Sequence, residues 1–205
     1  MDQIVEKFKD IPTTCLSDAM EGLNNLHPAI KPLQEAYKLA GRALTVKIPV
    51  GDNLAVLKAI RASKPGDIIV IDAKGDLYRA IAGDFVIGMA QTLGVGGFVV
   101  DGVIRDIAGI KALNFPVFAR GTTVAASGKA GVGEINIPIS CGGMTVHPGD
   151  MVVGDADGVV VIPQRVEQEV LEGSLKKLKK DQIREETISG NRDAILKHLD
   201  ELINK

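Results

Sequence analysis

Two acidic residues and one arginine stand around a predicted strand in the middle of the chain. Asp84 begins a predicted helix, and Arg105 and Asp106 come just after the predicted apolar strand Gly97–Val100. Ligands of α/β sheets bind at such carboxyl ends of strands. A carboxylate such as that of Asp106 can ligate a hard cation, and the planar guanidinium of Arg105 can bind a carboxylate or a keto oxygen. The spacing therefore indicates a site for a small anionic ligand and a cation.

The backbone at the start of the same helix offers a second kind of binding group. The amides of Phe85 and Val86 lie in the first turn of the predicted helix, where no helical carbonyl is placed to accept from them. The helix dipole favours a negative ligand there. A structural interpretation stands beside this functional one. In it, Asp84 and Asp106 only cap helices and Arg105 forms an ion pair with one of them. Spacing alone does not decide between the two.

Composition excludes several other classes of protein. The chain has 205 residues with 24 basic and 26 acidic side chains, a net charge of −2, and no tryptophan. Without a basic surface or aromatic stacking groups, we expect no nucleic-acid partner. The apolar runs are of strand length, so we expect no membrane partner and a cytoplasmic location. Cys15 and Cys141 are isolated and indicate neither a disulfide framework nor a thiolate metal site.

The hydrophobic pattern predicts one α/β domain. A βαβ unit comprises the strand Ile68–Ile71, the helix Asp84–Leu93 and the strand Gly97–Val100. Residues 120–163 are β-branched and glycine-rich, which favours short strands and hairpins. We expect an α/β domain over residues 1–163 and a helical C-terminal extension of the same domain over 164–205. Further predicted elements are the strands Leu39–Val50, Tyr78–Ala82, Pro116–Ala119 and Val159–Ile162, and the helices 2–9, Asn53–Ala62 behind Asp52, Asp106–Leu113, Pro163–Ser189 and Asn191–Ile203.

The long block from Gly83 to Asp106 resembles the signature of the RraA-like family. The likeness rests on Gly83-Asp84 through Ala90, Gly94, Gly97, Val99-Val100-Asp101-Gly102 and Arg105-Asp106. It extends over about residues 13–190 through Leu16-Ser17-Asp18-Ala19, Ala40-Gly41-Arg42-Ala43, Asp52-Asn53-Leu54, Pro65-Gly66-Asp67, Pro148-Gly149-Asp150 and Asp157-Gly158-Val159. The family includes class II 4-hydroxy-4-methyl-2-oxoglutarate aldolases, often also active as oxaloacetate decarboxylases, and the RraA regulators of ribonuclease E.

The resemblance implies a swivelling β/β/α-type fold, assembled into homotrimeric rings or homohexamers with active sites between subunits. It also implies that Asp106 holds a divalent metal, that Arg105 binds the pyruvoyl oxygens, and that Asp84 orders metal-bound water. The amides of Phe85 and Val86 would contact the pyruvoyl end of the substrate.

In some members of the family, a glutamate from the neighbouring subunit's C-terminal helix completes the site. Glu185 or Glu186 is a possible match here, with Glu185 placed near the metal through water, and Asp181 is also eligible.

Together these observations predict a metal-dependent lyase that releases pyruvate from a small 2-oxo acid. Retro-aldol cleavage and oxaloacetate decarboxylation both pass through a pyruvate enolate, whose negative oxygen a cation and Arg105 would stabilise. Oxygen ligands without paired histidines favour Mg²⁺ or Mn²⁺ over Zn²⁺. No lysine lies between Gly83 and Asp106, so no Schiff base is expected. The alternative from another class is a noncatalytic RraA-type regulator of ribonuclease E.

Overall fold

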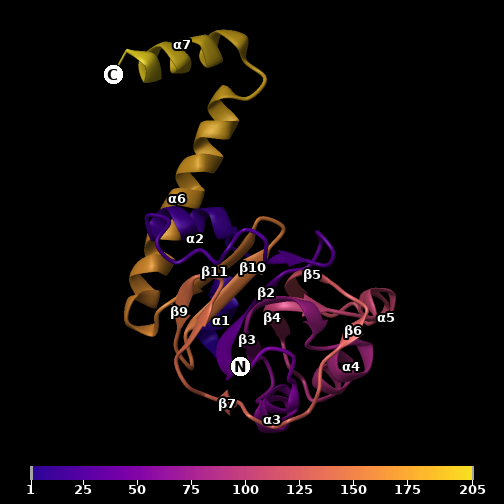
Figure 1. The fold of residues 1–205 in the computed structure, drawn as a ribbon. Coiled ribbons are helices and arrows are strands. Elements are labelled where there is room, and N and C mark those ends of the chain that lie inside the picture. Colours follow the sequence, from indigo (N-terminus) through magenta and orange to yellow (C-terminus); the bar gives the residue numbers. More distant parts are fainter. Residues whose placement is uncertain (1, 205) are drawn as a thin grey trace.

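A nine-stranded mixed sheet organises the protein, whose computed structural model describes residues 2–204 (Figure 1). Strands β2, β3, β4 and β5 run parallel, whereas β10 and β11 join the β2 edge antiparallel. The main path is β1 (Lys31–Pro32), β5 (Val117–Thr122), β4 (Gly97–Ile104), β3 (Ile68–Ala80), β2 (Leu39–Lys47), β10 (Met151–Asp155) and β11 (Gly158–Ile162). Short strands β6 (Ala125–Ala126) and β7 (Glu134–Ile135) pair with β3 and β2, and β8 (Ile139–Cys141) and β9 (Met144–Val146) form a separate pair.

The predicted βαβ unit is confirmed as β3, α4 (Asp84–Thr92) and β4. Every residue of β4 is buried, because the central strands of a parallel sheet are covered on both faces. The prediction of a separate strand over Tyr78–Ala82 is wrong. Residues up to Ala80 continue β3, which irregular pairing bends before it meets β4 again at Ala80 and Val103.

Helices cover the sheet in two groups. The helices α3 (Leu54–Ala62), α4 and α5 (Ile107–Ala112) pack into one cluster with β2, β3, β4 and β5. On the other side, α1 (Gln3–Phe8), α2 (Thr13–Ala19) and the start of α6 (Glu167–Ile188) pack on β10 and β11. Cys15 and Cys141 are both buried, and burial raises the pKa of both thiols, so they are packed side chains.

The C-terminal extension consists of helices that partly leave the body of the protein. The expected start of the long helix at Pro163 is wrong, because the 3-10 turn η1 (Gln164–Val166) precedes α6. Figure 1 shows the second half of α6 and α7 (Arg192–Ile203) projecting away from the sheet. Within residues 2–204, no helix combines the length and the apolar character needed to cross a membrane. The expected fold class is confirmed, and the boundary between residues 163 and 164 stays a prediction.

Candidate active site

The segments that follow β3 and β4 run side by side and carry the predicted site residues. The amide of Ile81 donates to the carbonyl of Val103 at 2.9 Å, and the amide of Arg105 donates to the carbonyl of Ala82 at 3.0 Å. These bonds continue the parallel pairing beyond the strand ends. They bring the start of α4 next to the start of α5, at the carboxyl ends of β3 and β4, where α/β sheets bind ligands.

All five predicted residues of the central block line one cavity of about 290 Å³. Its wall also contains Asn53, Ser127 and Lys129, which the sequence analysis did not single out. The complete lining is Asn53, Ala80, Ala82, Gly83, Asp84, Phe85, Val86, Arg105, Asp106, Ala126, Ser127 and Lys129. The structure therefore brings two acids and two cations to one small cavity.

Two glycines make room for the two carboxylates. A Cβ atom at Gly83 would overlap with Oδ2 of Asp106, and a Cβ atom at Gly109 would overlap with Oδ2 of Asp84. Gly83 directly precedes Asp84, and Gly109 lies on the helix that Asp106 precedes. Each carboxylate therefore lies against a glycine in the segment that carries the other acid: Asp106 against Gly83, and Asp84 against Gly109. A side chain at either glycine would push a carboxylate out of place.

Asp106 adopts a backbone conformation that is uncommon outside glycine. Its φ of 58° and ψ of 40° lie in the left-handed region, and its side chain accepts no capping hydrogen bond from α5. The capping interpretation therefore does not hold for Asp106. Its Oδ2 lies 3.3 Å from Nε of Arg105, but both side chains are more than two-fifths exposed, at 43% and 42%. Such an exposed ion pair contributes about 1 kcal/mol at most.

The amides at the start of α4 differ from each other. The amide of Phe85 donates to Oδ1 of Asp84 at 2.7 Å, so it is not free as the sequence analysis expected. The amide of Val86 has no acceptor within residues 2–204. A carboxylate ligand would find one open amide here, and would gain the second if the Asp84 carboxylate turned toward another partner.

A clamp built around Asp52 positions the loop that carries Ser127 and Lys129. The Asp52 carboxylate is 3% exposed and accepts from the amides of Leu54, Ala130 and Gly131. Burial raises the pKa of Asp52, but these accepted bonds outweigh it and hold that pKa below its usual value. One oxygen of Asp52 thus holds the start of α3, whose N-cap residue is Asn53, and the other oxygen holds the loop.

Further bonds tie the same loop to the cavity wall. The amide of Asn53 donates to the carbonyl of Gly128 at 3.1 Å, and the hydroxyl of Ser127 donates to the carbonyl of Ala80 at 2.8 Å. Lys129 lies between these fixed points. Lys129 reaches the cavity wall only through these long-range contacts, and nothing in the local sequence pattern predicts its position there.

Asn53 contributes a buried polar atom to the cavity wall. Its Nδ2 donates to the carbonyl of Ile81 at 3.0 Å, whereas its Oδ1 is buried and has no hydrogen-bond partner among residues 2–204. Buried acceptors of this kind are rare in folded proteins and mark places where a ligand or water donates. Asn53 is therefore a ligand-binding candidate that sequence reasoning missed.

The acid pair fits a hard divalent cation. Mg²⁺ is bound by one or two carboxylates, with waters and substrate oxygens completing its octahedral shell. Asp84 and Asp106 supply such a donor set, and residues 2–204 hold no larger His, Cys, Asp and Glu group for a metal. The same oxygen chemistry suits Mn²⁺.

The acids proposed to come from a second subunit lie far from this cavity within one chain. Glu185 and Glu186 are exposed on the projecting part of α6, and neither lines the cavity. Asp181 forms an ion pair with Arg184 at 2.8 Å and does not line the cavity either. A role for Glu185 in a neighbour's site stays a prediction.

Comparison with known proteins decides the family. The model of the RraA-like family, described as Aldolase/RraA, matches residues 13–161. This chain belongs to the RraA-like family. A protein of Halalkalibacterium halodurans named "Putative 4-hydroxy-4-methyl-2-oxoglutarate aldolase" is 60% identical over 98% of this chain and 95% of that protein.

Solved structures of other proteins share the fold. An uncharacterized protein from Pseudomonas syringae pv. tomato superposes with a TM-score of 0.81 at 28% identity, covering 93% of this chain and 94% of that one. The RNA-processing inhibitor RraA from Thermus thermophilus gives a TM-score of 0.69 at 29% identity, covering 75% of this chain and 93% of that one. The first of these structures matches a larger share of this RraA-like chain than the inhibitor does.

Proposed function

We propose that this RraA-like protein is a metal-dependent lyase that cleaves 4-hydroxy-4-methyl-2-oxoglutarate-type acids to pyruvate and also decarboxylates oxaloacetate. The observation that carries the proposal is the convergence of Asp84, Arg105 and Asp106 on one cavity. The name of the 60% identical relative supports an aldolase over other lyases. The active unit in this proposal is a homotrimeric ring or a homohexamer.

Arg105 acts on the oxygen where negative charge develops. Breaking the C3–C4 bond of a 4-hydroxy-2-oxo acid, or losing CO₂ from oxaloacetate, leaves the bonding electrons as a pyruvate enolate. The guanidinium of Arg105 donates to that oxygen, an effect worth about 10² to 10³ in rate for a single donor. Asp106, with Asp84 acting through water, would hold a divalent cation, which would supply further positive charge to stabilise the enolate.

Asp84 controls the proton. In aldol cleavage the C4 hydroxyl loses its proton as C4 becomes a carbonyl carbon, and a water held by Asp84 accepts it. The same group then returns one proton to C3 of the enolate, which yields pyruvate. Decarboxylation needs only this second transfer, so one site serves both reactions. The open amide of Val86 binds the pyruvoyl carboxylate during these steps.

Lys129 gives the cavity a second cation for a second carboxylate. Both proposed substrates carry a carboxylate at each end, and Arg105 occupies the pyruvoyl end. Lys129 lines the same cavity from the loop that also carries Ser127. We assign it to the distal carboxylate, whose charge the ammonium group balances.

Lys129 also lies in the cavity where its amine could form an imine with the keto group of the substrate. No lysine lies between Gly83 and Asp106, but Lys129 from outside this block lines the cavity. Borohydride reduction in the presence of substrate separates the routes. The proposed mechanism gives no covalent adduct by mass spectrometry, whereas an imine would leave a reduced adduct on Lys129.

A coupled pyruvate assay tests the proposal. After subtraction of the release measured without protein at the same metal concentration, protein treated with EDTA should release no pyruvate, and Mg²⁺ or Mn²⁺ should restore release from both substrates. The structural likeness to the Thermus inhibitor favours a second function, regulation of ribonuclease E by binding. Absence of metal-stimulated release from a panel of 4-hydroxy-2-oxo acids, together with binding to ribonuclease E, would favour that function instead.

A further inference from the structure

Strand β4 carries a buried carboxylate in the middle of an apolar run. Every residue of β4 is buried, and Asp101 is its one charged residue. A buried charge is costly unless partners compensate it. One oxygen of Asp101 pairs with Nε of Arg120 on β5, and the other accepts from the amide of Gly142, between β8 and β9, at 2.8 Å. The carboxylate therefore holds β4 to two other segments.

The ion pair of Asp101 and Arg120 lies outside the active-site cavity. Neither residue lines that cavity. Asp101 and Val99 are two residues apart and so share one face of β4. Val99 packs with Phe118 and with β8 on that face, whereas α4 and α5 cover the other face of the strand. Any effect of the pair on chemistry in the cavity must therefore pass through the backbone of β4.

The backbone pairing of β4 is interrupted on both sides at Asp101. Toward β5, Val100 pairs with Ala119 and Val103 pairs with Gly121, so two residues of β4 lie opposite one residue of β5. Toward β3, the register shifts over the same stretch of β4. This arrangement is a β-bulge, which is uncommon between parallel strands. Bulges bend a strand and occur beside active sites, where they direct a side chain.

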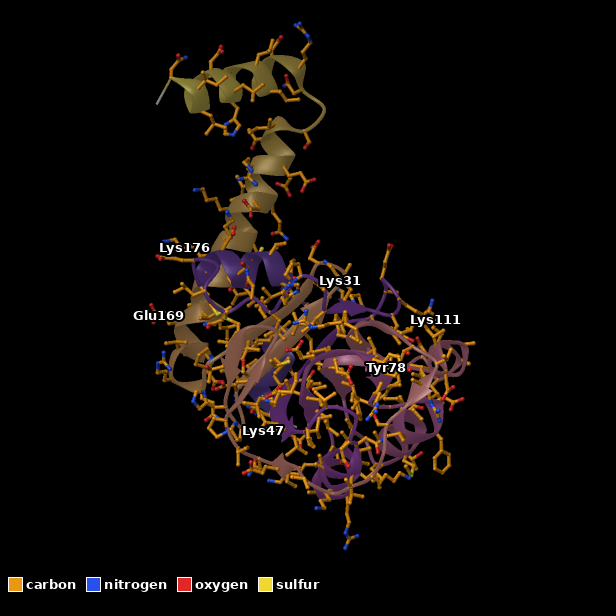
Figure 2. The ribbon with its side chains drawn as sticks, in the orientation of Figure 1. Lys31, Lys47, Tyr78, Lys111, Glu169 and Lys176 are labelled. Atoms are coloured by element: carbon orange, nitrogen blue, oxygen red, sulfur yellow. The ribbon has the colours of Figure 1, made fainter. Side chains whose placement is uncertain are left out.

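The ion pair spans this bulge. Arg120 is the residue of β5 opposite the bulge, and Asp101 is one of the two bulged residues of β4. Because regular backbone pairing is lost there, the pair supplies the contact between the two strands. Gly102 is the other bulged residue, and a Cβ atom on it would lie 2.9 Å from Cβ of Ala73. Figure 2 shows side chains filling the space around β3, β4 and β5, so the bulge is enclosed by packed groups.

The bulge lies directly before the segment that carries the arginine and the second acid of the site. Pairing resumes on both sides at Val103, and the amide of Arg105 then donates to the carbonyl of Ala82 at 3.0 Å. Only Val103 and Ile104 separate the bulge from Arg105. So short a stretch of strand passes a change of direction at the bulge on to Arg105 and Asp106.

We propose that the ion pair of Asp101 and Arg120 is a positioning pair, which fixes the bulge in β4 and thereby aims Arg105 into the active-site cavity. The pair serves the reaction of the proposed function, and its kinetic test rests on that function. Arg105 acts on charge that develops in the transition state, so a misaimed guanidinium lowers kcat. KM depends more on Val86 and Lys129, which come from other segments of the cavity wall.

Variants of the pair test the proposal through pyruvate release at saturating Mn²⁺. Asp101→Asn and Arg120→Gln should each lower kcat about 10²-fold and leave KM within about threefold, the effect of moving a catalytic group by about 1 Å. The double variant should lose no more than the more affected single variant, because the two side chains act as one unit. Arg120→Lys keeps the charge and should retain a kcat about tenfold above that of Arg120→Gln.

Phe8→Leu separates positioning from a general loss of stability. Phe8 is fully buried where α1 packs on β10 and β11, so its shortening should lower Tm and leave kcat unchanged. Thermal melts on all variants give the folded fraction. A similar loss of kcat in Phe8→Leu, or an unchanged kcat in folded Asp101→Asn and Arg120→Gln, would overturn the proposal. If Arg120→Gln fails to fold, Asp101→Asn gives the same comparison, because it keeps the shape of the side chain.

A crystal structure of Asp101→Asn reports the geometry without any assay. The pairing of Val103 should shift, and the guanidinium of Arg105 should leave the cavity wall. An unchanged direction of Arg105 would overturn the positioning role. Absence of pyruvate release from the wild-type protein would instead count against the proposed function, and the crystal structure would still decide whether the pair aims Arg105.

Discussion

Gly83 and Asp106 share the same small space, because the position of a Cβ atom at residue 83 is already filled by a carboxylate oxygen of Asp106. The side chain proposed to hold the metal is thus set by a residue that carries no chemistry. Asp84 and Gly109 repeat the relationship from the other side. Both contacts form only when the segments after β3 and β4 lie together.

Gly83→Ala should therefore reduce metal binding while the fold survives. The φ of Gly83 is −125°, which alanine adopts without strain, so the added methyl acts by displacing the Asp106 carboxylate. We expect apparent Mn²⁺ affinity to fall about 10- to 100-fold, the usual effect of disturbing groups that orient a metal ligand. Titration calorimetry gives the affinity, and a thermal melt checks folding. Gly173→Ala is the matched control, because its Cβ would meet Ala19 at an ordinary 3.4 Å; equal affinity in both variants would contradict the prediction.

Arg105→Lys should retain the fold and lose activity. A lysine keeps the charge but cannot reproduce the planar donor fork at the enolate and carboxylate oxygens. We expect kcat/KM to fall by about 10² to 10³, measured by pyruvate release at saturating metal. Arg165→Lys, at an exposed position of η1, provides the control for the general effect of this substitution. Unchanged turnover in Arg105→Lys would remove Arg105 from the mechanism.

Asp52→Asn should loosen the loop that carries Lys129 and make stability less dependent on acid pH. Asparagine keeps only one of the two acceptor oxygens, so either the amide of Leu54 or the amides of Ala130 and Gly131 lose their acceptor, and one unsatisfied buried donor costs about 1–3 kcal/mol. Because the folded pKa of Asp52 lies below its usual 3.8, its ionised form adds stability above pH 3.8. That contribution disappears as the pH falls through the lower folded pKa.

Melting curves from pH 2 to 7 check this prediction. The difference in Tm between wild type and Asp52→Asn should be largest near neutral pH and should narrow as the pH falls below 3.8. The exposed Asp10→Asn variant should follow wild type throughout. A constant difference at all pH values would show that the clamp does not depend on the ionised carboxylate.

Lys129→Gln should affect the dicarboxylic substrate more than the product. Oxaloacetate has a distal carboxylate that loses its ammonium partner, so its KM should rise about tenfold, the loss of roughly one charged hydrogen bond. Pyruvate lacks that carboxylate, and its inhibition constant should stay within twofold of wild type. Lys38→Gln, at an exposed site away from the cavity, is the control. A parallel rise in both constants would place Lys129 at the pyruvoyl end.

Much of this protein is determined by the sequence itself. The βαβ unit follows from apolar strands on either side of an amphipathic helix, and these local patterns do not depend on distant residues. Strand order then places Asp84, Arg105 and Asp106 at one sheet edge, because neighbouring parallel strands end together. For the same reason the sequence predicted that the two acids and the arginine lie close together, and in the structure they line one cavity.

Only the tertiary structure decided what surrounds that cluster. Lys129 and Asn53 come from two segments that meet through the buried Asp52 clamp. The hydrogen bonds of this clamp join Asp52 to residues 78 and 79 positions further along the chain, and no local sequence pattern indicates such a contact. The contacts of Gly83 with Asp106 and of Gly109 with Asp84 depend on how closely a glycine backbone approaches a carboxylate from another segment. The hydrophobic pattern of the sequence does not predict such a close approach. Burial of the sheet's apolar faces fixes where each loop begins and ends. The positions of the loop ends in turn fix the positions of Lys129 and Asn53 in the cavity wall.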